Sequence, residues 1–223
     1  MRAPISVIIP TLNAETTLPS CLGGLVEGLE KGLIRELIVT DGGSQDQTVS
    51  IAKEWGGEVV SGAPSRGGQL HRGCERAQGD WLLVLHADTV LAPGWVGPVG
   101  AHLSRQDAAY FRLQFDQGGR WVAAWANLRS RWGLPYGDQG LLISKALYEA
   151  TGGYRDIPLM EDVALAQTLK GKLTALDATA VTSAQKYRQR GWMRQGARNL
   201  MTLARYFGGA DPEALAAAYR RSR

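Results

Sequence analysis

The stretch LVLHADT, Leu83–Thr89, is an apolar run that ends on a histidine and a carboxylate. A buried strand normally ends in a turn rich in Gly, Asn or Pro, so this ending calls for an explanation. One interpretation is that Asp88 caps a helix that begins near Ala92-Pro93-Gly94. The other is that the strand delivers His86 and Asp88 to a functional site. The flanking sequence distinguishes the two.

Strand and helix patterns alternate on the amino-terminal side of this stretch. Apolar, β-branched runs predict strands at 5–9, 36–40, 58–61 and 81–85, and helical periodicity predicts helices at 15–29, 44–55 and 69–77. Ser44 and Gln47 match a capping box, which places the start of the second helix at Ser44. Strands that are apolar throughout belong to a parallel sheet covered by helices on both faces. The order therefore predicts an α/β fold.

The carboxyl ends of these strands carry polar groups. The segment 11–13 follows the first strand, Asp41 ends the second, and Asp88 lies just beyond the fourth. In parallel α/β sheets, ligands bind beyond the carboxyl ends of the strands. Two carboxylates at one edge of the sheet favour a binding site over two unrelated caps.

The second half of the chain is less regular. Patterns predict strands at 108–115, 141–143 and 172–180, helices at 121–132, 144–151 and 159–169, and a polar loop at 136–140. From residue 186 onward there are nine Lys or Arg and two acids, a net charge of +7, whereas the rest of the chain carries −3. We therefore expect a folded domain at 1–185 and a basic helical segment at 186–223.

The basic segment has two stripes at helical spacing. Arg190, Arg194, Arg198 and Arg205 form one, and Met193, Ala197, Leu200 and Ala204 form an adjacent apolar one. This pattern suits a helix that lies on a membrane surface, and equally a helix that packs its apolar stripe on the domain. No pattern in this segment matches a nucleic-acid-binding module, so no nucleic-acid partner is expected.

The chain shows no signal for secretion or for crossing a membrane. The amino terminus enters a strand directly, without a separate apolar region and cleavage site. No apolar run approaches the roughly 20 residues that a membrane-spanning helix needs. Cys21 and Cys74 form no metal or redox motif and are expected to stay free. These features predict a cytoplasmic protein, peripheral to the membrane if the basic helix makes contact with it.

Five segments, taken in order, resemble family 2 glycosyltransferases of the GT-A fold. They are IIPTLNAE at 8–15, ELIVTDGGSQDQT at 36–48, LHADT at 85–89, GDQGLLISKALYEATGGY at 137–154 and PLMEDVALAQTLK at 158–170. The chain is most similar to small, soluble bacterial-type members whose metal motif reads His-Ala-Asp. The resemblance implies a Rossmann-like, mostly parallel sheet flanked by helices, followed by a C-terminal helical segment.

The resemblance also implies a site for a nucleotide-diphosphate sugar. The matching positions are Thr11, Leu12, Asn13, Glu15, Asp41, Arg66 and Asp88. Asp41 could accept a hydrogen bond from a uracil-type imide, which favours a UDP-linked donor. Asp41 as a turn carboxylate and Arg66 as a surface residue are the structural alternatives.

A divalent metal, Mn²⁺ or Mg²⁺, is part of the implied chemistry. His86 replaces the first acid of the usual motif, so Asp88 is its only carboxylate and the expected ligand, with phosphate oxygens and water completing the shell. His86 is expected to pack beside the site, although an imidazole would be tolerated by Mn²⁺.

The Glu161-Asp162 pair resembles the family's motif in which the Asp is the general base of an inverting transfer. Asp138, Gln139 and Glu161 are then expected on the acceptor side. The structural alternative for the pair is the favourable placement of acids in a first helical turn.

Two rival functions remain open. A sugar nucleotidyltransferase would carry a basic, glycine-rich loop after the first strand, whereas residues 11–15 read TLNAE. A non-catalytic nucleotide-sugar-binding or interaction module is favoured by the acid missing at His86 and opposed by the retained Asp162. The sugar and the acceptor, whether lipid, saccharide, peptide or small molecule, are not specified by the sequence.

Overall fold

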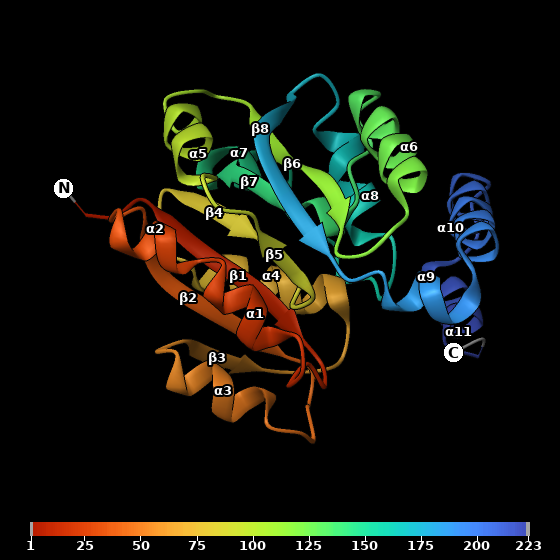
Figure 1. Cartoon of the computed structure of the whole chain (residues 1–223), viewed down its shortest axis with the longest axis horizontal. Helices are drawn as coiled ribbons and strands as arrows, with labels where there is room; N and C mark the ends of the chain where they lie inside the picture. Colours follow the sequence, from red (N-terminus) through yellow and green to blue (C-terminus); the bar gives the residue numbers. More distant parts are fainter. Residues whose placement is uncertain (1, 222–223) are drawn as a thin grey trace.

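A single mixed sheet organises the chain (Figure 1). The computed structural model describes residues 2–221, and within them eight strands pair in the order β3-β2-β1-β4-β7-β6-β8-β5. The strands are β1 (Ile5–Thr11), β2 (Ile34–Asp41), β3 (Glu58–Ser61), β4 (Trp81–Val84), β5 (Thr89–Leu91), β6 (Ala108–Phe115), β7 (Leu141–Ser144) and β8 (Leu173–Thr182). The predicted α/β class is confirmed.

Helices cover the sheet and extend beyond it at the C-terminus. They are α1 (Leu18–Gly23), α2 (Val26–Glu30), α3 (Thr48–Glu54), α4 (Arg66–Arg76), α5 (Val96–His102), α6 (Arg120–Arg131), α7 (Lys145–Ala150), α8 (Glu161–Thr168), α9 (Gln185–Arg190), α10 (Trp192–Phe207) and α11 (Pro212–Arg221). A 3-10 turn, η1 (Gly137–Gln139), precedes β7.

The two halves of the sheet pair differently. In the amino-terminal half, β1 is parallel to both β2 and β4, and β2 is parallel to β3. In the other half, β7 is antiparallel to β4 and β6, and β5 is antiparallel to β8, while β6 and β8 are parallel. The carboxyl ends of β1, β2 and β4 therefore meet at one edge, as the polar residues at their ends predict.

Both faces of the sheet are buried, as the wholly apolar strands predict. Alternate side chains of β1 enter different cores because successive residues of a strand point to opposite faces. Val7 and Ile9 pack with Leu22 of α1 and Val99 of α5. On the other face, Ile8 packs in a core built with α4, α7 and α8. Cys21 and Cys74 are buried and free, as expected.

Three predicted helix boundaries are wrong. The expected helix at 15–29 is split into α1 and α2, with a break at Gly24-Leu25. The capping box at Ser44 does not form; α3 begins at Thr48, whose backbone N–H donates to the Asp46 carboxylate. After Asp88 the chain enters β5, and α5 begins only at Val96, so Asp88 does not cap a helix.

The C-terminal segment packs on the domain through a face other than the predicted one. Phe115 of β6 makes edge contacts with Tyr187 and Trp192, at ring centroid distances of 5.0 and 5.2 Å. Of α10, Gln195 and Leu203 are the buried side chains, whereas the predicted apolar stripe is exposed. Residues 222–223 of the predicted segment lie outside the described residues. No helix in residues 2–221 combines the length and apolarity needed to span a membrane.

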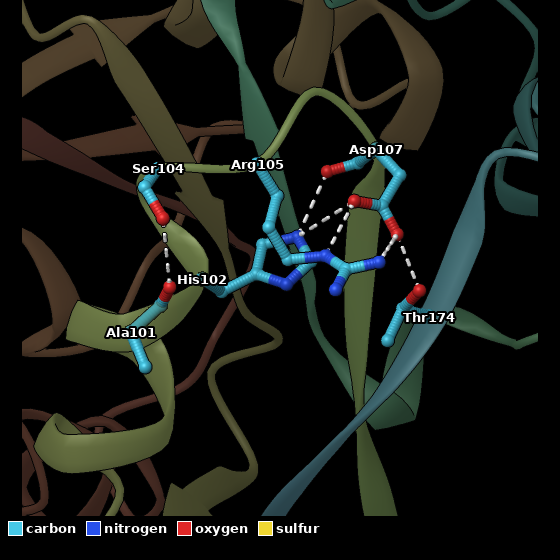
Figure 2. Close-up of polar contacts among 6 residues, drawn as sticks. All are labelled: Ala101, His102, Ser104, Arg105, Asp107 and Thr174. Atoms are coloured by element: carbon cyan, nitrogen blue, oxygen red, sulfur yellow. Dashed lines mark hydrogen bonds and ion pairs between the residues drawn. The ribbon is translucent and has the colours of Figure 1, made fainter.

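A polar cluster closes the opposite edge of the sheet, at the amino ends of β6 and β8 (Figure 2). The Asp107 carboxylate receives two hydrogen bonds from the Arg105 guanidinium, at 2.8 and 3.2 Å, and one from Thr174 Oγ1. Buried His102 donates from Nε2 to the Asp107 carbonyl at 2.8 Å, since a carbonyl only accepts. The bonds from Arg105 and Thr174 outweigh burial and lower the pKa of Asp107 to about 2.

Candidate active site

The ends of β1 and β2 form a closed polar turn. Thr11 and Asp41 are register partners, and Thr11 Oγ1 donates to the Asp41 carboxylate at 3.2 Å. The same carboxylate accepts from the backbone N–H groups of Gly43 and Ser44, at 2.8 and 2.9 Å. Burial alone would raise the pKa of Asp41, but the bonds from Ser44, Gly43 and Thr11 lower it. Asp41 is thus a turn carboxylate that stays ionised at the strand end.

The loops after β1 and β2 hold each other in place. Asn13 adopts a left-handed conformation, with φ of 51°, and its backbone N–H donates to Ser44 Oγ at 2.8 Å. In return, the Asn13 side chain accepts from the Gln45 N–H at 2.9 Å. Glu15 accepts from the Gln47 N–H at 3.0 Å. These bonds leave Leu12 projecting from the loop, 50% exposed.

Sequence reasoning missed Gln69 of α4. Its Nε2 donates to the carbonyls of Thr11 and Thr40, at 2.8 and 2.6 Å, so one buried amide ties together the ends of two strands. A Cβ at Gly42 would lie 3.1 Å from Gln69 Oε1, which explains the small residue after Asp41. No motif marks Gln69, because a glutamine two turns from a loop reads like any helix residue.

The amino end of α4 meets the loop before α8. The Gly67 N–H donates to the Ile157 carbonyl at 3.0 Å, and a Cβ at Gly67 would lie only 2.0 Å from the Arg155 carbonyl oxygen. Glycine is therefore required for this approach. The contact brings Arg66, the first residue of α4, to Glu161, the first residue of α8, with 3.7 Å between Nε and Oε1.

Three predicted acids gather around the Arg66 guanidinium. Burial would lower the pKa of Arg66, but the negative charges of Glu161, Asp162 and Asp88 raise it. Glu161 is only 1% exposed, and neither of its carboxylate oxygens has a hydrogen-bond partner within residues 2–221. Burial raises the pKa of Glu161 to about 7; Arg66 acts against this and Asp162 reinforces it.

Asp162 is held at the same place by the loop before β7. Its Oδ2 accepts from the Gly137 N–H at 2.7 Å, and its Oδ1 accepts from the Val163 N–H at 2.7 Å. The His86 ring lies on the other side of Gly137, because a Cβ there would sit 2.4 Å from His86 Nε2. The 86–88 segment and the 137–139 turn are thus packed together at the site.

The two other acceptor-side predictions have different surroundings. Gln139 is fully buried, and its side chain bonds with Ser130 Oγ at 2.5 Å and the Phe111 carbonyl at 3.1 Å. Gln139 therefore holds the turn in place and does not face an acceptor directly, contrary to expectation. Asp138 lines a pocket between α6 and α10, together with Tyr136 and Tyr187.

The residues present fit a divalent ion that arrives with a diphosphate. No group of three or more His, Cys, Asp or Glu side chains in the described part of the chain is placed to hold a metal. Asp88 is a half-buried carboxylate immediately after β4, and a hard cation can combine one such ligand with phosphate oxygens and water. Asp88 is the residue that would hold the ion.

The sequence has known relatives. The model of glycosyl transferase family 2 matches residues 6–155, so the chain belongs to that family. A PGL/p-HBAD biosynthesis glycosyltransferase of Mycobacterium tuberculosis is 38% identical over 99 residues. That match covers 41% of this chain and 38% of the relative, so the chain spans well under half of the relative's length.

Solved structures share the fold. A fragment of S. aureus TarS in complex with UDP-GlcNAc superposes with a TM-score of 0.67 at 17% identity, covering 81% of this chain and 58% of that one. Glucosyl-3-phosphoglycerate synthase from M. tuberculosis, in complex with Mn²⁺, UDP and glucosyl-3-phosphoglycerate, gives a TM-score of 0.59 at 22% identity, covering 81% and 70%. The predicted GT-A arrangement of a sheet flanked by helices is confirmed.

Proposed function

We propose that this chain transfers a sugar from a UDP-linked donor to an acceptor hydroxyl, with inversion at the anomeric carbon. The observation that carries the proposal is the gathering of Asp88, Glu161 and Asp162 around Arg66, beside the strand ends that hold Thr11 and Asp41. Three acids and one arginine in a partly buried group are expensive for stability, and such groups are typical of functional sites.

The donor half of the proposal rests on the 11–15 and 41–47 loops. Their mutual hydrogen bonds present a preformed surface for a base and ribose, with Leu12 projecting from it and ionised Asp41 at its base. TarS binds UDP-GlcNAc in its complex, and the mycobacterial synthase binds UDP with Mn²⁺. Both precedents support a UDP-linked donor for this chain.

The catalytic half of the proposal assigns the general base to Asp162. An acceptor hydroxyl loses its proton as its oxygen attacks the anomeric carbon, and a carboxylate oxygen takes that proton. The Gly137 N–H fixes the carboxylate from one side and so orients it. Arg66 and Glu161 complete the wall of the site. An ion bound by Asp88 would neutralise the leaving diphosphate.

Calorimetric titration tests the donor assignment. We expect UDP to bind more tightly in the presence of Mn²⁺ or Mg²⁺ than in its absence, and more tightly than ADP or GDP. Release of UDP from a panel of UDP-sugars then tests turnover. Binding without turnover on any acceptor would favour the non-catalytic nucleotide-sugar-binding module; the absence of UDP binding would refute the proposal.

A further inference from the structure

Two helices expose a set of large apolar side chains on the face of the molecule away from the sheet. We call this set the α6–α10 surface. Each member is between 41% and 74% exposed: Trp121, Trp125, Leu128 and Trp132 from α6 and its carboxyl cap, and Met193, Leu200, Met201 and Phe207 from α10. Soluble proteins seldom leave so many large apolar side chains in water without a partner.

The two helices contribute to one continuous surface. The α6 side chains recur at spacings of four and three residues, so they share one helical face. Trp125 and Trp132 make an edge contact with 6.2 Å between ring centroids. Trp125 also lines the same pocket as Leu200 of α10, and Figure 1 shows the two helices side by side at one end of the molecule. The α6–α10 surface is therefore contiguous through Trp125.

The charge around this surface has a single sign. Helices α6, α9 and α10 together contain nine Lys or Arg and no Asp or Glu. Two of the arginines are used internally: Arg129 stacks on Tyr136, and Arg198 on Tyr219. Arg120, Arg131, Arg194 and Arg205 are exposed on the same two helices as the apolar set.

We propose that the α6–α10 surface binds an anionic lipid bilayer, with its tryptophans and methionines at the boundary between headgroups and acyl chains. Tryptophan favours that boundary, and arginines beside it attract anionic headgroups. A second copy of this chain is a poorer occupant, because a symmetric dimer would bring two wholly basic surfaces together. The inference does not depend on the proposed function, since it uses no residue of the donor site.

The position of the surface has a consequence for the acceptor. The pocket between α6 and α10 is lined by Trp125 and Leu200 on the surface side, and by Tyr136 and Asp138 from the turn that holds Asp162. A bilayer bound at the α6–α10 surface would therefore lie next to the acceptor side of the candidate active site. An acceptor presented from the membrane is the class that this arrangement suits.

Vesicle co-sedimentation tests the inference. Full-length protein is mixed at low salt with vesicles of phosphatidylcholine alone or of phosphatidylcholine with phosphatidylglycerol. We expect binding to the anionic vesicles and quenching of tryptophan emission by brominated lipid. Trp132→Ser combined with Met193→Ser and Met201→Ser should weaken binding at least tenfold, on the order of what the loss of three buried apolar side chains implies. Trp55→Ser, at an exposed tryptophan on the opposite side of the chain, is the matched control.

The charge contribution is tested separately. Arg194→Glu combined with Arg205→Glu should reduce binding by roughly tenfold or more, since each basic residue near an anionic surface contributes about 1 kcal/mol. Lys31→Glu with Lys53→Glu makes the same charge change away from the surface and should have a smaller effect. All variants should retain UDP affinity and the circular dichroism spectrum of the parent.

Three outcomes would overturn the inference. One is the absence of binding to anionic vesicles at low salt. A second is equal loss of binding in the surface variants and in their controls. The third is self-association, measured by sedimentation velocity, that the three-residue variant abolishes; a second copy would then be the occupant.

Discussion

Two pairs of an arginine and a carboxylate lie at opposite edges of the same sheet, and they differ in every respect except their chemistry. At the amino edge, Arg105 bonds Asp107 at 2.8 and 3.2 Å and Thr174 adds a third bond, so the pKa of Asp107 falls to about 2 (Figure 2). At the carboxyl edge, Arg66 stays 3.7 Å from buried Glu161, whose pKa rises to about 7.

The difference separates a group that is completed by the fold from one that is left incomplete. Asp107 has its partners within the protein, so its charge contributes to stability. Glu161 is buried without hydrogen bonds and beside a second acid, which costs free energy that the folded chain must recover elsewhere. Such a cost is typical of a site that a ligand completes, and the following predictions test that contrast.

The largest effect is expected at Asp162. Asp162→Asn keeps the bond from the Gly137 N–H but removes the proton acceptor, so turnover should fall by ~10²–10⁴. UDP affinity and the free energy of unfolding should change little, because the donor is held by other strand ends. The measurements are UDP release from the donor, UDP calorimetry and urea unfolding. A variant with parental turnover would place the base elsewhere, with Asp138 the next candidate.

Asp88→Ala should weaken the metal-dependent part of UDP binding. Losing a supporting group around a metal typically costs 10–100-fold in affinity, and loss of the carboxylate ligand should cost at least the upper end of that range, about 100-fold. His86→Ala is the matched comparison and should cost much less, because the ring packs on Gly137. Calorimetry with UDP and Mn²⁺ measures both variants. Equal losses would make His86 a ligand, and no loss in Asp88→Ala would remove the metal assignment.

The pH dependence of stability should reveal the incomplete site. The pKa of Glu161 rises from 4.5 to about 7 on folding, so the folded state holds this proton more tightly than the unfolded state. Its contribution to stability therefore falls as the pH increases from 4.5 to 7. Glu161→Gln removes that loss, so the variant should gain stability relative to the parent at about pH 8 compared with about pH 5.

Urea unfolding at the two pH values measures this gain, and Glu149→Gln on the exposed face of α7 is the control. A stability difference between Glu161→Gln and the parent that is identical at both pH values would show that Glu161 does not titrate in this range. Turnover of Glu161→Gln should fall less than that of Asp162→Asn.

The smallest effect is expected at the completed cluster, and its sign is opposite. The pKa of Asp107 is lowered from 3.8 to about 2, so its stabilisation is present above 3.8 and is lost as the pH falls towards 2. Asp107→Asn should lower stability at neutral pH by on the order of 1 kcal/mol, since water screens the exposed Arg105 partner. This deficit should shrink at about pH 3, while turnover stays unchanged. An equal deficit at both pH values would mean that packing, and not the charge, is responsible.

The sequence by itself determined the fold class and the edge at which the site lies. Uniformly apolar strands such as Trp81–Val84 have to be buried on both faces, and the polar groups that follow them collect at one edge whatever the details of packing. It also placed the order of the elements, because hydrophobic period is a local property. It failed where local signals compete: Ser44 matched a capping box, yet its hydroxyl is used by Asp41 and Asn13.

Only the tertiary structure decided which of the edge residues meet. Arg66 reaches Glu161 because Gly67 lets α4 approach the loop before α8, a contact between segments far apart in the chain. The burial of Gln139, the strand-tying bonds of Gln69 and the exposed face of α10 have the same origin. Amphipathic spacing fixes which residues share a helical face, but the partner surface selects which face is buried, and that choice depends on contacts with Phe115 and its neighbours that no local pattern contains.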